Sequence, residues 1–156
     1  MRTTYRVFAY LIAAAVVVQA MAIAYALAGL GKWIEDDHGV LNKQVLDNED
    51  LHFRGSGGFA LHAIDGMMII PALALLFVII SFFAKVPGGS KRAGTIFGLI
   101  VLQVILGFTL HGVPLVAPLH VLNAFIILGV AIMSGQRAAA ATSYAPAEAT
   151  PQPAMG

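Results

Sequence analysis

The chain has 156 residues, of which 59% are hydrophobic and only 11% are charged. A typical soluble domain is about one quarter charged. The complete absence of cysteine excludes disulfides, thiolate metal sites and iron–sulfur clusters. The net charge is +1, and no basic stripe is interleaved with aromatic residues. Nucleic acid is therefore not an expected partner, whereas a lipid bilayer is.

Four apolar stretches are long enough to cross a membrane. An uncharged apolar stretch of about 18 or more residues predicts a transmembrane helix. Such spans are predicted at about residues 7–30, 59–83, 93–110 and 115–133. The first span follows a basic leader, but its apolar core exceeds the roughly 7–15 residues of a signal peptide, so we expect an uncleaved anchor. Residues 1–135 are thus predicted to form one all-α integral membrane domain, an up-down-up-down four-helix bundle.

The segments between the spans differ in charge. Residues 32–58 form a long, mostly acidic loop that ends in the glycine-rich run 55–58, and residues 85–92 form a tight basic turn. A short uncharged turn is predicted at residues 111–114. Residues 136–156 are rich in alanine and proline, and this composition predicts a disordered tail.

The positions of lysine and arginine predict the orientation of the bundle, because short cytoplasmic loops carry an excess of them. Three basic residues, Lys32, Lys43 and Arg54, lie in the acidic loop. The six on the opposite side are Arg2, Arg6, Lys85, Lys91, Arg92 and Arg137. Both termini are therefore predicted to be cytoplasmic, with the acidic loop outside.

Two histidines are predicted to lie inside the membrane at one depth. His62 is close to the outer end of the second span, and His120 is about six residues into the fourth. At about 1.5 Å of rise per residue, the two lie within roughly one helical turn of the same depth. Ionisable residues within spans are rare and face the bundle interior. The second and fourth spans take diagonal positions in such a bundle, so the two imidazoles are placed to hold a haem from both sides.

The other three histidines carry less information. His38 and His52 fall in the acidic loop, where a histidine is ordinarily a surface residue. His111 stands at the outer end of the third span, and its position suits a surface residue as well as it suits the surroundings of a haem.

Asp65 lies one turn after His62 and shares its helix face. Two interpretations stay open: Asp65 orients His62 or takes part in proton movement, or it only lines a wet outer cavity. Gly66 and Gly107 are expected to thin the helices where a planar ligand needs room.

Further features inside the spans are less specific. Gly94 and Gly98 form a GxxxG motif, which suits packing inside the bundle as well as dimerisation. Gln103 and Asn123 are expected to form hydrogen bonds across helices, and Pro71 is expected to bend the second span.

The segment from residue 103 to residue 124 resembles one half of haem A synthase. That family repeats a four-helix unit twice, with a histidine early in the second and fourth helices of each half. The matching residues are Gln103, Leu106, Gly107 and Thr109 in the third span, Val116, Ala117, His120 and Ala124 in the fourth, and His62 and Gly66 in the second. The resemblance covers about residues 5–135, and the chain is similar also to small four-span proteins of unknown function with this single-unit plan.

Departures from the family pattern narrow what the resemblance implies. Ala63 stands where the family has arginine, and Phe59 stands where the catalytic half has glutamate. The outer-loop cysteine pair of many members is absent. The resemblance therefore implies that this chain corresponds to the half of the synthase that holds a cofactor haem. It does not imply that one chain alone hydroxylates haem. A homodimer would restore two haem sites.

We accordingly predict a haem-b protein with His62 and His120 as axial ligands, near the outer leaflet of a bacterial plasma membrane. Bis-histidine ligation leaves no open iron position, which favours electron transfer or support of a respiratory or haem-processing complex. A second hypothesis is a zinc or copper site made by the histidines and the acidic loop. A third is a scaffold subunit without a cofactor.

Overall fold

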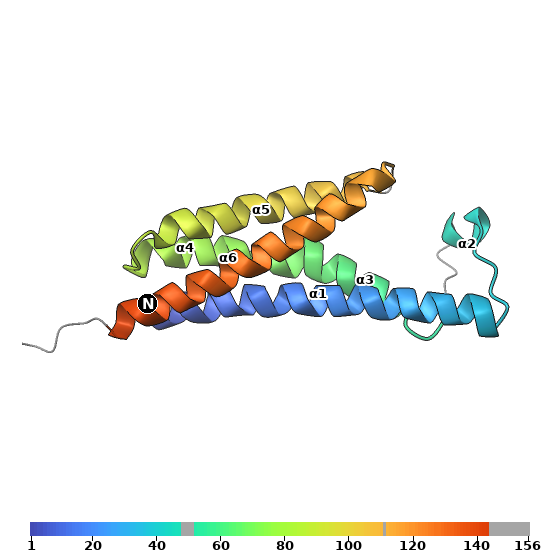
Figure 1. The fold of residues 1–156 in the computed structure, drawn as a ribbon, viewed down its shortest axis with the longest axis horizontal. Helices are drawn as coiled ribbons and strands as arrows, with labels where there is room; N and C mark the ends of the chain where they lie inside the picture. The colour runs from blue at the N-terminus through green and yellow to red at the C-terminus, as the bar shows by residue number, and fades with distance from the viewer. Residues whose placement is uncertain (48–51, 111, 144–156) are drawn as a thin grey trace, which may run out of the picture.

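The computed structural model describes residues 1–47, 52–110 and 112–143 (Figure 1). The helices of this part, in chain order, are α1 (Arg2–Asp36), α2 (Lys43–Asp47), α3 (Gly57–Ile64), the π-helix η1 (Asp65–Ile69), α4 (Ile70–Phe83), α5 (Gly89–Thr109), the 3₁₀ turn η2 (Pro114–Val116) and α6 (Ala117–Ser143). Four helical segments are long and apolar enough to cross a membrane: Arg2–Asp36, Gly57–Phe83, Gly89–Thr109 and Pro114–Ala141. The predicted all-α bundle of four spans is confirmed.

The four spans form a closed ring of neighbours. Helix α1 packs against α6 and against α3 and α4, while α5 packs against α4 and α6. The second and fourth spans therefore occupy diagonal positions, as predicted from the chain order. Figure 1 shows the start of α1, the turn between α4 and α5 and the end of α6 at one end of the bundle.

Two long-range hydrogen bonds tie that end together. The fully buried Tyr5 donates its hydroxyl to the Gly89 carbonyl at 3.1 Å, and its ring lies 4.4 Å from that of Phe77 between centroids. Arg2 donates from Nη1 to the Ala141 carbonyl at 3.0 Å. The basic residues assigned to one side of the membrane are thus gathered at one end of the bundle.

The packing of the bundle is typical of a membrane protein. Small and aliphatic residues fill the interior, including the fully buried Ala9, Ile12, Ala74 and Ile96. Large apolar side chains cover the outside, a distribution that suits contact with lipid and would leave a soluble protein with large exposed apolar patches.

The ends of two spans differ from the prediction. Helix α1 continues to Asp36, where Lys32 pairs with Asp36 one turn along the helix. Helix α6 continues to Ser143, so residues 136–143 belong to a helix and the predicted tail boundary is wrong. The reason is tertiary contact: Ala138 is buried, and Ala141 accepts the hydrogen bond from Arg2. The rest of the predicted tail lies outside the described residues.

The second span contains a π-helical turn just before Pro71. Proline has no backbone N–H and would crowd the carbonyl four residues earlier. The chain widens here instead, and the N–H of Ile70 bonds to the Asp65 carbonyl five residues back. Figure 1 shows α3 and α4 offset at this point, as expected for the bend assigned to Pro71. Single π-turns of this kind are frequent at functional sites.

The GxxxG motif does not serve packing inside the described bundle. A Cβ atom built at Gly94 or Gly98 would meet no neighbouring atom within 4 Å among the described residues. Both glycines lie on the outward face of α5, and of the two interpretations only dimerisation stays a prediction.

Candidate functional site

The structure brings His62 and His120 together. His62 lies on α3 and His120 in the first turn of α6, and their ring centroids are 6.3 Å apart with the ring planes inclined by 50°. Two imidazoles that bind one metal ion from opposite sides, with metal–nitrogen bonds of about 2 Å, have centroids about 6 Å apart. The spacing of the two rings therefore suits one metal ion between them.

The His62 ring is fixed by a residue of α1. Nδ1 of His62 lies 3.1 Å from the Gln19 backbone carbonyl, which can only accept, so Nδ1 carries the proton. The lone pair of the neutral ring is then on Nε2, the atom left for a metal. Histidines that bind metals are commonly oriented by such a bond from the second ring nitrogen.

Gln19 also uses its side chain. Its Nε2 donates to the His62 backbone carbonyl at 3.2 Å, so two hydrogen bonds join these residues in opposite directions. The sequence analysis missed Gln19. The available signal was a lone amide within the apolar first span, where the structure buries it to 7% exposure.

Gly66 makes this contact possible. A Cβ at Gly66 would overlap the amide of Gln19, so only glycine lets that amide reach the second span. The space beside Gly66 is taken by the Gln19 amide, and the predicted room for a planar ligand stays a prediction.

His120 is positioned by close packing against α5. A Cβ at Gly107 on α5 would lie 3.3 Å from Cε1 of His120, so the glycine permits the close approach of this ring. The Gln103 backbone lies beside the ring, but the buried Nδ1 atom has no hydrogen-bond partner among the described residues. His120 is thus positioned by close packing on α5 and by the Gln103 backbone.

Both histidines line a cavity of about 120 Å³ between the helices. Apart from the histidines, Gln19 and Gln103, its walls are apolar, with residues of α1 on one side and of α6 on the other. Val121 and Phe125 in this wall are 53% and 66% exposed on the outside of the bundle. The histidine cavity therefore borders the lipid-facing surface between α1 and α6.

Asp65 is buried to 4% exposure beside this site. Its carboxylate interacts electrostatically with His62, and its Oδ2 atom has no hydrogen-bond partner within the described part of the chain. Asp65 lines neither the histidine cavity nor the smaller cavity next to it. Both interpretations of Asp65 therefore stay predictions: a role beside His62, or a place in the lining of an outer cavity.

The remaining histidines do not join the site in the part of the chain that can be described. His38 and His52 are exposed, and His111 lies outside the described residues. Over residues 1–47, 52–110 and 112–143, no three histidine, aspartate or glutamate side chains gather as a metal site. The zinc or copper hypothesis gains no support from these residues.

The predicted bond between Gln103 and Asn123 is confirmed. Asn123 donates from Nδ2 to Oε1 of Gln103 at 2.7 Å and to the Leu99 carbonyl at 2.8 Å. This pair joins α5 to α6 at the level of the histidine cavity.

Comparison of the chain with protein-family models, curated proteins and solved structures finds no match. The resemblance to haem A synthase consequently stays a prediction.

Proposed function

We propose that the chain binds one haem b in the membrane, with His62 and His120 as the axial ligands. The observation that carries this proposal is the 6.3 Å separation of two imidazoles from diagonal spans. The hydrogen bond from Nδ1 of His62 to the Gln19 carbonyl, which leaves Nε2 for the iron, supports it. The apolar walls of the histidine cavity suit a porphyrin better than a hydrated ion.

Haem iron supplies reversible one-electron chemistry when it is bound. In this chain both axial positions would be taken by histidine, so no position would be left for oxygen or a substrate. The proposed role is therefore electron transfer, or an accessory role in a respiratory or haem-processing complex. The excess of basic residues at one end supports a bacterial plasma membrane with both termini cytoplasmic.

The proposal is tested by the absorption spectrum of the purified protein. We expect expression with ample haem supply to give a detergent-solubilised protein with about one haem per chain and sharp cytochrome-b bands in the reduced-minus-oxidised spectrum. A folded protein without porphyrin absorbance would overturn the proposal. Metal analysis of the same sample separates a zinc or copper protein from one that holds no cofactor.

Gly66→Ala is expected to weaken haem binding without removing a ligand. The added methyl would displace the Gln19 amide from the His62 carbonyl. Loss of such an orienting contact typically costs roughly 10–100-fold in affinity for a bound metal, and we expect a fall of about tenfold for haem. Haem titration of the apoprotein measures the effect. Gly129→Ala is the matched control, because a Cβ there would meet nothing within 4 Å among the described residues, and an equal loss in both variants would contradict the role given to Gly66.

A further inference from the structure

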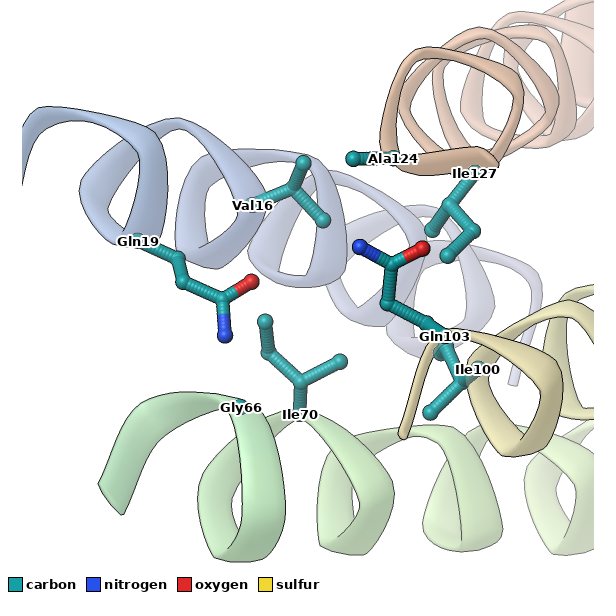
Figure 2. A pocket seen from close by; sticks show the side chains of 8 residues that line it. All are labelled: Val16, Gln19, Gly66, Ile70, Ile100, Gln103, Ala124 and Ile127. Carbon is teal, nitrogen blue, oxygen red and sulfur yellow. The ribbon is translucent and has the colours of Figure 1, made fainter. Parts of the chain in front are cut away.

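A second, smaller cavity lies beside the histidine cavity. Its volume is about 10 Å³, and both cavities are lined by Val16, Gln19, Gln103 and Ala124, so they adjoin. Figure 2 shows Gln19 and Gln103 on facing sides of this cavity, with Val16 and Ile70 around it. The cavity is therefore apolar except for two amides from different helices.

The hydrogen bonds of Asn123, Gln103 and Gln19 fix which way each amide points. The Leu99 carbonyl can only accept, so Asn123 must present its NH₂ group to both Leu99 and Gln103. Gln103 then turns its oxygen to Asn123 and its nitrogen into the cavity.

The same reasoning applies to Gln19. Its NH₂ group donates to the His62 carbonyl, which leaves the Gln19 oxygen turned towards the cavity. A donor from α5 and an acceptor from α1 thus face each other.

Gln103 Nε2 is buried without a hydrogen-bond partner among the described residues, in a side chain that is 9% exposed. An unpaired buried donor is costly, by about 1–3 kcal/mol in proteins. A water molecule needs roughly 10–15 Å³ of such space and two to four polar partners. The cavity offers about that volume, one donor and one acceptor.

We propose that one buried water molecule binds between Gln103 and Gln19 and completes a hydrogen-bonded belt through all four spans. The belt runs from Asn123 on α6 to Gln103 on α5, through the water to Gln19 on α1, and on to His62 on α3. The water accepts from Nε2 of Gln103 and donates to Oε1 of Gln19. It reaches the site through the adjoining histidine cavity, and the belt links the orientation of His62 to the packing of every span.

The test uses the full chain without haem, so its outcome is independent of the proposed function. Glutamine and asparagine side chains are labelled with ¹⁵N, and through-space contacts between their amides and water are recorded by NMR in detergent. The rotating-frame nuclear Overhauser experiment separates a through-space contact from proton exchange with water, because the two give cross-peaks of opposite sign. We expect the Gln103 amide to contact a long-lived water, while the exposed Gln44 and Gln136 serve as internal controls with short-lived hydration only.

Ala124→Val fills the cavity with two methyl groups and keeps both glutamines. We expect it to remove the long-lived water contact while the Gln103–Asn123 bond persists, seen as an unchanged Asn123 amide shift. A wild-type Gln103 amide that contacts no long-lived water, or that contacts Gln19 directly, would overturn the proposal. So would a water contact that survives Ala124→Val.

Discussion

Replacing either His62 or His120 with alanine is expected to reduce bound haem to near zero while the bundle stays folded. Each ring would supply one of the two iron ligands, and among the described residues no third histidine, aspartate or glutamate gathers with them as a metal site. Neither ring belongs to the fully buried core, and both are only partly buried at the cavity, so truncation removes little packing. The ratio of haem to protein and the helical circular dichroism of the purified variants measure the two parts of this prediction.

The other histidines provide matched controls for the ligand variants. His38→Ala, His52→Ala and His111→Ala should each retain the full haem content. His120→Met tests the site more sharply, because methionine is also an axial ligand and raises the reduction potential relative to bis-histidine ligation. A haem-containing His120→Met protein with a raised potential would identify that position as a ligand. Full haem content in either alanine variant would exclude the assigned pair.

The arrangement of the spans could be predicted from the sequence because it depends mainly on the length of the apolar runs and on their order along the chain. The lengths of the uncharged runs predicted four helices, and the up-down-up-down order of the spans predicted that the second and fourth take diagonal positions. Counting residues from the span ends was enough to place His62 and His120 at one depth, and the structure confirms that their rings are neighbours. The depth of a residue in the membrane and the order of the spans depend only on position along the chain, so both can be read from the sequence.

The features that the sequence analysis missed depend on contacts between distant residues. Gln19 contacts His62 across 43 positions, and Arg2 contacts Ala141 across 139. The first contact fixes the orientation of a candidate ligand, and the second extends α6 beyond its apolar run. From composition alone, residues 136–143 were predicted to belong to the disordered tail. An alanine-rich sequence does not indicate which distant residues it will contact, so the extension of α6 could not be predicted.

Gly58→Val is expected to separate α3 from α1 and to remove His62 from its partners. Gly58 is buried where the two helices approach most closely: a Cβ there would overlap the Ala22 backbone carbonyl and lie 3.0 Å from the Ala26 Cβ. A backbone carbonyl cannot swing aside as a flexible side chain does, so the helices themselves must move. Overpacking of this kind costs typically about 1–3 kcal/mol. We expect a lower midpoint of thermal unfolding in detergent, with or without haem.

The same displacement reaches the candidate site because Gly58 lies one helical turn before His62 and on the same face. Moving this face away from α1 lengthens the contact between His62 Nδ1 and the Gln19 carbonyl and changes the spacing of the two imidazoles. Haem affinity should fall at least as far as for Gly66→Ala, since the backbone of α3 shifts and not just one amide. Gly57→Val is the matched control: it has a similar cost in helix propensity, but a Cβ at this position would meet nothing within 4 Å among the described residues. Equal losses of stability and haem in both variants would mean that the unfavourable helix propensity of valine causes the loss. Close packing of α3 on α1 would then not be what holds His62 in place.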